Sequence, residues 1–207
     1  MRDYKFTNNW FVEGASGVWG SLIPKLKPRT ILEIGSFEGA STCFLIDKLA
    51  PVQDVELFCV DTWSGGIEHQ LAQVDMQGVE ARFRHNVAEA TRHSVHKVEL
   101  NIRKGPSDVE LARLLSEGKA GYFDFVYIDG SHQAPDVLCD AVLGFKLLKT
   151  GGIMAFDDYI WSEHAPAETD AVRCPKVAID AFVNINHKKL QLLRAPLFQL
   201  YVKKLSD

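Results

Sequence analysis

Two adjacent acidic residues, Asp157 and Asp158, follow a short apolar run at residues 153–156. Neighbouring side chains on a strand point to opposite faces, and two carboxylates at the end of a buried strand repel one another. Such a pair requires a cation, a ligand or water to balance or solvate its charge. A third acid, Asp129, ends another apolar run at residues 122–129. These three carboxylates are the first candidates for chemistry.

A glycine-containing segment, LEIGSFEGAS at residues 32–41, precedes a second acidic strand end at Asp61. This arrangement fits a nucleoside, because glycine lets the backbone approach the ligand and the carboxylate can accept both ribose hydroxyls. A dinucleotide turn requires G-x-G-x-x-G, and Phe37 occupies the position of its second glycine. Glu33 would repel a phosphate and attract an ammonium group. The turn therefore favours a ligand with an adenosine, no phosphate and an amino-acid end over NAD.

Strand-like and helix-like segments alternate along the chain, which predicts an α/β fold with helices on both faces of a parallel sheet. Two final strands follow each other without a helix and predict an antiparallel edge. We therefore expect a doubly wound, Rossmann-like, mostly parallel sheet of seven strands with an antiparallel C-terminal edge hairpin. Strands are expected at residues 30–34, 55–61, 98–103, 122–129 and 153–156 and twice within 190–204, and helices at residues 40–49, 78–90, 106–115, 135–148 and 175–185.

Sheets of this kind bind ligands beyond the carboxyl ends of their strands. Five of the expected strand ends carry acidic or small residues, and this convergence is the strongest functional signal in the chain. Ser107 also has capping-box spacing to Glu110, which predicts that Ser107 is the N-cap of a helix. The converging residues are Glu33–Gly35, Asp61, Gly105–Ser107, Asp129 and Asp157–Asp158.

Four motifs between residues 31 and 159 resemble those of the class I S-adenosylmethionine-dependent methyltransferases: EIGSFEG, VDTW, IDGSH and FDDY. Within that superfamily, the chain resembles the small metal-dependent O-methyltransferases of the catechol and bacterial antibiotic-sugar types. Their signature resembles D-G-x-H-x-Y-x-x-V-x-x-D, and Ala134 stands here where the tyrosine is usual. The residues that match the signature are Asp129, Gly130, His132, Val137 and Asp140.

The resemblance implies S-adenosylmethionine as cofactor, with its methionine end against the glycine turn and its ribose at Asp61. Trp63 and Ser107 would flank the adenine. The residues expected to bind the cofactor are Glu33, Gly35, Ser36, Gly39, Ser41, Asp61, Trp63 and Ser107.

The resemblance also implies a divalent cation held by Asp129, Asp157 and Asp158, and an oxygen-only site of this kind suits Mg²⁺. The cation would hold a hydroxyl of a small-molecule acceptor and lower its pKa. His132, three residues after Asp129, is the candidate base that removes the hydroxyl proton before attack on the sulfonium methyl. Asp129 and His132 are accordingly the expected catalytic residues.

Three other functions stay open. An NAD-dependent oxidoreductase would use a similar sheet, although Phe37 and Glu33 argue against it. The alanine at position 134 leaves room for a cofactor-binding module without transfer activity. Metal-dependent hydroxylation by an enzyme of the same fold is a further alternative.

Composition and charge limit the number of domains and the classes of partner that we expect. At 207 residues, with 46% hydrophobic residues, the chain is expected to form one domain, residues 1–207. A net charge of −4 without a basic run argues against nucleic-acid binding, and no apolar run is long enough to span a membrane. Four scattered cysteines predict free thiols, mostly buried, in a cytoplasmic protein. A homo-oligomer is considered because related enzymes are often dimers or larger.

Specificity for the acceptor is expected in segments that lie outside the motifs. Residues 1–28 are predicted to form an N-terminal lid or substrate segment, with Trp10 and Phe11 as its aromatic part. The loops at residues 64–76 and 160–170 are the other candidates, because polar and aromatic insertions beyond strand ends suit a lid.

Overall fold

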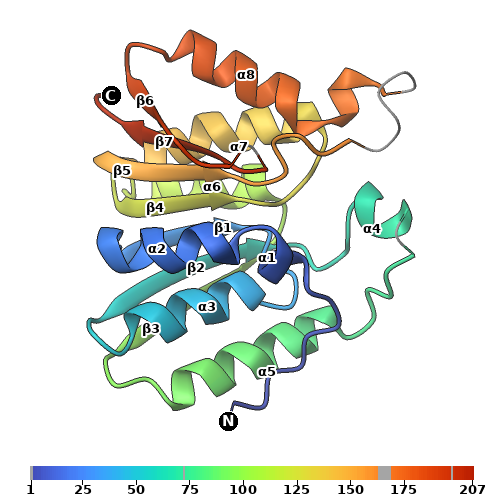
Figure 1. Ribbon diagram of the computed structural model, residues 1–207, viewed down its shortest axis with the longest axis vertical. Helices are drawn as coiled ribbons and strands as arrows, with labels where there is room; N and C mark the ends of the chain where they lie inside the picture. The colour runs from blue at the N-terminus through green and yellow to red at the C-terminus, as the bar shows by residue number, and fades with distance from the viewer. Residues whose placement is uncertain (1, 72, 163–168, 197) are drawn as a thin grey trace.

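A computed structural model of the chain describes residues 2–71, 73–162, 169–196 and 198–207. Its strands are β1 (Thr30–Ile34), β2 (Val55–Asp61), β3 (Val98–Lys104), β4 (Phe123–Ile128), β5 (Leu148–Phe156), β6 (Leu190–Leu193) and β7 (Leu200–Lys204). They form one seven-stranded sheet in the order β3-β2-β1-β4-β5-β7-β6 (Figure 1). β7 runs antiparallel to both β5 and β6, whereas β1 to β5 pair in parallel. The expected fold class is confirmed.

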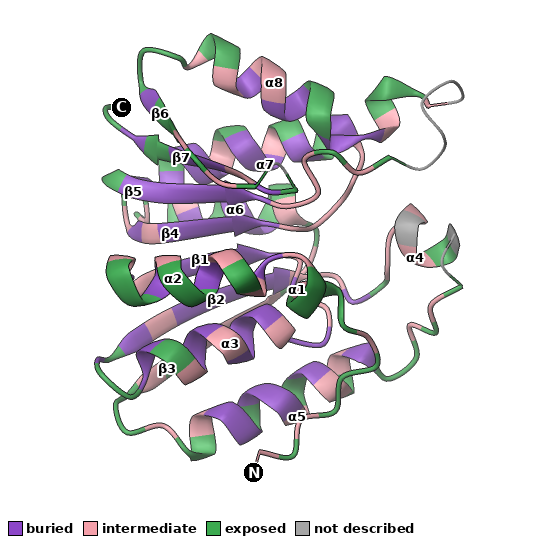
Figure 2. Ribbon diagram, viewed as in Figure 1, coloured by how far each residue is buried: buried purple, intermediate pink, exposed green. Residues whose placement is uncertain are grey.

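The helices are α1 (Trp10–Glu13), α2 (Ser16–Leu26), α3 (Ala40–Leu49), α4 (Ile67–Leu71), α5 (Val79–Arg92), α6 (Ser107–Ser116), α7 (Ala134–Leu147) and α8 (Pro175–Ile185), with a 3₁₀ turn at Ala171–Arg173. Among these described helices, none is both long and apolar enough to cross a membrane. α2, α3 and α5 pack on strand residues such as Ile31 and Leu57, and α6, α7 and α8 pack on Leu32 and Phe58. Successive strand residues point to opposite faces of the sheet, so each face is covered by one of these two sets of helices. The buried sheet lies between the helices, whose outer faces are exposed (Figure 2).

Part of the N-terminal segment belongs to the core. In α2, Trp19 and Ile23 are fully buried. The Trp19 ring lies edge-on to Tyr127 of β4, with centroids 4.6 Å apart, and its Nε1 donates to the Tyr201 hydroxyl of β7 at 3.0 Å. α2 is therefore part of the scaffold, and the lid function remains a prediction for the residues that precede it.

The residues before α1 are fixed to the glycine turn through Glu38. The Thr7 backbone N–H and hydroxyl donate to the Glu38 carboxylate at 2.7 and 2.8 Å. Arg82 of α5 donates to the same buried carboxylate, and Asn86 donates to the Glu38 carbonyl at 2.9 Å. One carboxylate thus connects the N-terminal segment, α5 and the turn.

The start of α6 differs from the sequence prediction. The helix begins at Ser107, and Pro106 occupies the N-cap position with φ −59° and ψ 140° and no side-chain cap. Proline has φ fixed near −65°, so it makes this extended turn without a capping side chain. Glu110 pairs with Arg113 rather than reaching back to the helix start. The prediction that Ser107 is the N-cap is therefore wrong.

The four cysteines are free thiols, as expected. Cys43, Cys59 and Cys174 are buried, and Cys139 on α7 is only half-buried. Burial raises the pKa of the Cys43 thiol to about 12. These thiols therefore pack as small apolar groups.

Gly35 brings two loops into backbone contact. Its backbone is left-handed, with φ 84°, and its N–H donates to the Val60 carbonyl at 2.9 Å. A Cβ atom at this position would overlap the Asp129 carbonyl oxygen and lie 2.8 Å from the Gly130 Cα. Glycine is required here by conformation and by space, and the turn after β1 therefore touches the loop after β4.

Gly35→Ala is expected to destabilise the protein by about 3 kcal/mol or more, because a left-handed residue costs about 1–2 kcal/mol and backbone overlap adds to that cost. Gly118 is the matched control, since its φ is 79° and an added Cβ meets nothing within 4 Å. Gly118→Ala should cost only the conformational term of about 1–2 kcal/mol. Urea unfolding measures both, and equal losses would contradict the close approach.

Candidate functional site

Glu33 lies beneath the glycine turn at the end of β1 and is fully buried. Its carboxylate accepts hydrogen bonds from the hydroxyls of Ser36 at 2.6 Å, Ser41 at 2.5 Å and Thr42 at 2.5 Å. Burial raises the pKa of Glu33, and these hydroxyl donors offset part of that rise because they stabilise the charged form. The net result is a raised pKa for a carboxylate whose two oxygens both accept hydroxyl donors beneath the turn.

Asp61 at the end of β2 holds the turn from the other side. Its carboxylate accepts the backbone N–H groups of Ser36 and Phe37, each at 2.8 Å, and of Trp63 at 2.6 Å. An ionised carboxylate offers about four acceptor sites, so these three bonds leave capacity for a ligand hydroxyl. The ribose assignment of Asp61 stays a prediction that this geometry accommodates.

Trp63 contacts the glycine turn through its indole ring. Its ring packs on Phe83 with centroids 5.0 Å apart, and only 6% of the residue is exposed. The indole Nε1 donates to the Phe37 carbonyl at 2.9 Å, and both Phe37 and Trp63 have positive φ, 46° and 54°. Left-handed bulky residues are uncommon, and this hydrogen bond helps to hold them. A contact between Trp63 and adenine stays a prediction.

Aromatic rings from three separate segments meet at the tip of the turn. Phe37 stacks on His69 of α4 with centroids 5.1 Å apart and lies 5.4 Å from the ring of Trp10 in α1. Trp10 is 49% exposed. Two of the predicted specificity segments therefore meet over the predicted cofactor turn.

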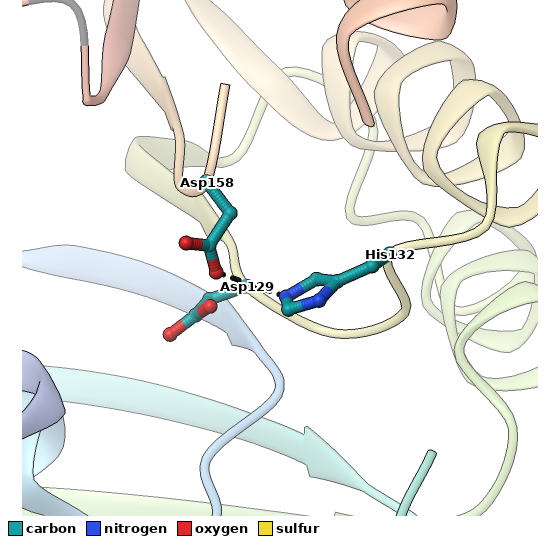
Figure 3. Close-up of side chains that lie close together, drawn as sticks. All are labelled: Asp129, His132 and Asp158. Atoms are coloured by element: carbon teal, nitrogen blue, oxygen red, sulfur yellow. Dashed lines mark ion pairs between the residues drawn. The ribbon is translucent and has the colours of Figure 1, made fainter. Parts of the chain in front are cut away.

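The acidic cluster gathers at the ends of β4 and β5. Asp129, His132 and Asp158 each offer a ligand atom, and these atoms all lie within 4.8 Å of one another (Figure 3). His132 Nε2 lies 2.9 Å from Asp158 Oδ2, and the His132 ring lies 4.3 Å from the ring of Trp161. Asp158 has φ 53°, in a turn just after β5. His132 thus lies beside the carboxylates, as its candidate role requires.

Asp157 lies beside this group and has different partners. Its Oδ2 accepts a hydrogen bond from the Tyr127 hydroxyl, and its Oδ1 accepts the Asp158 backbone N–H at 2.9 Å. The same Tyr127 hydroxyl lies 3.0 Å from Asp129 Oδ2. The structure therefore brings Asp129 and Asp158 together directly and relates Asp157 to Asp129 through a phenol.

The electrostatics of this cluster fit a divalent cation. Burial, followed by the charges of Asp157 and Asp158, raises the pKa of Asp129 well above its usual range. Burial and Asp158 raise the pKa of Asp157 to about 6. Among the described residues, no lysine or arginine forms an ion pair with any of the three carboxylates. Crowded oxygen ligands without a cationic side chain are the donor set that Mg²⁺ prefers.

Ser107 lies next to a second buried acid. Asp140 of α7 is 1% exposed, and its Oδ1 has no hydrogen-bond partner among the described residues. Burial raises the pKa of Asp140 to about 7, and hydrogen bonding by the Ser107 side chain offsets part of the rise. The signature residue Asp140 thus contacts the strand end where adenine is expected.

A family model described as a methyltransferase domain matches residues 32–159, which is more than half of the chain and includes every strand end described above. The chain belongs to this methyltransferase family. Curated relatives include caffeoyl-CoA O-methyltransferase 1 of Eucalyptus globulus, 25% identical over 155 residues that cover 72% of this chain and 52% of the relative. The caffeoyl-CoA O-methyltransferase of Populus kitakamiensis is 26% identical over 149 residues, 72% of this chain and 54% of the relative. The methyltransferase chain spans about half the length of these relatives.

Solved structures share the fold of this methyltransferase. An O-methyltransferase of Bacillus cereus in complex with SAH superposes with a TM-score of 0.63 at 18% identity and covers 98% of this chain and 84% of that one. The O-methyltransferase TomG of Streptomyces achromogenes in complex with SAM gives a TM-score of 0.62 at 20% identity, with 91% and 78% covered. At these identities the likeness establishes the fold alone.

Three contributors to the methyltransferase site were missed by sequence reasoning: Thr42, Tyr127 and Glu38. Thr42 follows the predicted Ser41, and both hydroxyls reach Glu33. The alternation of side chains along a strand could have identified Tyr127, because residues two apart share a face and Tyr127 lies two residues before Asp129. Nothing local distinguishes Glu38, whose partners are distant in sequence.

Asp140→Asn is expected to become progressively stabilising, relative to wild type, as pH rises from 5 to 8. The folded pKa of Asp140, about 7, lies above the ordinary value of 3.8 for an aspartate, so its favourable contribution is full below pH 4 and is lost as pH rises through 7. Between pH 5 and pH 8 the difference between the variants should change by about 3 kcal/mol.

Urea unfolding at pH 5, 6.5 and 8 measures this difference. Asp75→Asn is the control, because Asp75 is exposed and its side chain accepts the Gln77 N–H at 2.8 Å, a bond that asparagine can also accept. A difference between wild type and Asp140→Asn that is constant with pH would show that Asp140 ionises normally in the folded protein.

Proposed function

We propose that this methyltransferase is an S-adenosylmethionine-dependent, divalent-metal-dependent O-methyltransferase that acts on a hydroxyl group of a small molecule. The observation that carries the proposal is the contact of Gly35 with the backbone of Asp129 and Gly130. It puts the nucleoside-type turn and the acidic cluster side by side at one sheet edge. A methyl donor and a hydroxyl acceptor must be this close for transfer in a single step.

The glycine turn suits the amino-acid end of the cofactor. The Glu33 carboxylate, with both oxygens directed beneath the turn, suits an ammonium group better than a phosphate. Asp61 keeps acceptor capacity for ribose hydroxyls after its three backbone bonds. Gly35, Ser36, Gly39 and Ser41 form the rest of the proposed binding turn, with Trp63 and Ser107 toward the adenine.

Asp129, Asp157 and Asp158 would hold a divalent cation, for which we propose Mg²⁺. When bound, such a cation lowers the pKa of an acceptor hydroxyl and orients it, and S-adenosylmethionine supplies the methyl group. Asp129 is fixed relative to the glycine turn, because it follows β4 directly and its backbone N–H donates to the Ile34 carbonyl at 2.8 Å.

His132 would take the acceptor proton. Its ring is held between Asp158, 2.9 Å from Nε2, and Trp161. An adjacent carboxylate stabilises the imidazolium that forms when a histidine accepts a proton, as in other acid–base pairs of this kind. His132 and Asp158 therefore act together in the proposed proton transfer.

The acceptor would enter beneath the aromatic groups at the rim. Trp10 and His69 lie on one side, and Trp161 and the exposed Phe198 belong to segments next to β5 and β7. Of these rings, Trp161 lies beside the acidic cluster, 4.3 Å from the His132 ring, and a half-buried ring there suits a planar or apolar acceptor. Of the predicted specificity loop at residues 160–170, residues 163–168 lie outside the described residues.

The free thiols support our assignment to a reducing, cytoplasmic compartment.

Thermal unfolding with S-adenosylhomocysteine tests the cofactor class. At about a hundred times its dissociation constant, a ligand stabilises by about 2.7 kcal/mol, which for a domain of this size raises the Tm by about 5–10 °C. We expect this rise with S-adenosylhomocysteine and none with NADH. A rise with NADH alone would assign the sheet to an oxidoreductase instead.

His132→Ala is expected to lower kcat by about 10²–10⁴-fold, because it removes the base, while S-adenosylhomocysteine affinity is unchanged. Transfer of labelled methyl to a panel of catechols and vicinal diols, with Mg²⁺ present, is the assay. His187→Ala is the control, because it removes an exposed imidazole whose Nδ1 lies 3.0 Å from the Asn184 carbonyl at the end of α8. Near-normal turnover of His132→Ala would exclude this base, and cofactor binding by the wild type without turnover on any acceptor would favour a binding module.

A further inference from the structure

Tyr127 places a single hydroxyl between two of the proposed metal ligands. Tyr127 lies on β4, two residues before Asp129, and is fully buried. The hydroxyl lies 3.0 Å from Asp129 Oδ2 and donates to Asp157 Oδ2. Asp129 follows β4 and Asp157 follows β5, so the phenol connects acids from two adjacent strands.

Packing and hydrogen bonds hold the ring of Tyr127 in place. Trp19 of α2 packs on it edge-to-face, with centroids 4.6 Å apart. Trp19 is itself held by the hydrogen bond from its Nε1 to the Tyr201 hydroxyl at 3.0 Å, and Tyr201 donates to the buried Gln199 side chain. These contacts fix the position of the Tyr127 ring, and with it the position of its hydroxyl relative to the two carboxylates.

Packing does not account for the oxygen of Tyr127. A phenylalanine would fill the same space against Trp19, and burying a hydroxyl is unfavourable unless it is hydrogen-bonded. The partners of this hydroxyl are the two carboxylates. Its role is therefore directed at Asp129 and Asp157.

We propose that Tyr127 is a positioning residue of the metal site, whose hydroxyl holds Asp129 and Asp157 in the orientation that a divalent cation requires. This inference rests on the proposed function, because it assumes that the carboxylates bind a cation. Two carboxylates without a common donor would turn apart by mutual repulsion, and cation binding would have to draw them together again. Groups that hydrogen-bond to metal ligands in this way fix their orientation, and their loss lowers metal affinity.

Tyr127→Phe tests the proposal because it removes one oxygen atom and keeps the ring on Trp19. Binding of Mn²⁺, a paramagnetic substitute for Mg²⁺, is followed by the electron paramagnetic resonance signal of the free ion, and competition with Mg²⁺ checks the site. We expect Tyr127→Phe to bind Mn²⁺ about 10–100-fold more weakly than wild type. Affinity for S-adenosylhomocysteine, measured by calorimetry, should be unchanged, which also verifies that the variant is folded.

Tyr122→Phe is the matched control. Tyr122 precedes the same strand at its other end, and its hydroxyl donates to Glu56 at 2.5 Å, remote from the cluster. This variant should bind both ligands as wild type does. A cycle with Asp157→Asn adds a test of mechanism: if Tyr127 acts through Asp157, Tyr127→Phe should weaken Mn²⁺ binding less in the Asp157→Asn background.

The outcomes separate the two proposals. If wild type binds Mn²⁺ and Tyr127→Phe binds it equally tightly, the positioning role is overturned and the metal-dependent function stands. If wild type binds S-adenosylhomocysteine but no Mn²⁺, the metal part of the proposed function fails, and the role of Tyr127 fails with it. Equal weakening by Tyr127→Phe and Tyr122→Phe would assign the effect to general destabilisation and would also overturn the inference.

Discussion

Buried negative charge at the carboxyl edge of the sheet is the constraint that the rest of the site serves. Each acid has its own means of compensation: Glu33 has three hydroxyls, Asp61 has backbone N–H groups, and Asp158 has an imidazole. Asp129 and Asp157 share one phenol. Among these acids, Glu33 and Asp61 have three donors each, whereas Asp129 and Asp157 share one phenol, and the proposed cation would supply positive charge there.

The same donors that compensate the charges also fix the loops. Asp61 orders the turn after β1 by accepting its backbone N–H groups, and Glu38 attaches that turn to α5 and to the N-terminal residues. The proposed cofactor turn is therefore held by side chains of β2 and α5 and by the residues before α1. Preorganisation of this kind lowers the ordering cost of binding.

The fold was predictable from the sequence because its information is local. Apolar runs and helical spacing gave the alternation, and strand ends in a parallel sheet must share one edge, which placed Glu33, Asp61, Asp129 and Asp157 together. The start of α6 was not predictable from spacing alone, since proline took the cap position from Ser107. Contacts between distant segments, such as Trp19 with Tyr127 or Thr7 with Glu38, leave no periodic signal, and only the three-dimensional structure shows them.

The aromatic contact of Trp10, Phe37 and His69 has a consequence for how such an enzyme diversifies. Trp10 and His69 come from short helices outside the sheet, and neither takes part in the hydrogen bonds that hold Glu33 or Asp61. Under the proposed function, exchange of these two side chains would alter acceptor preference while the hydrogen bonds that hold the glycine turn stay in place. For directed evolution, a small library at these two positions would then sample acceptor preference while the hydrogen bonds to Glu33 and Asp61 are kept.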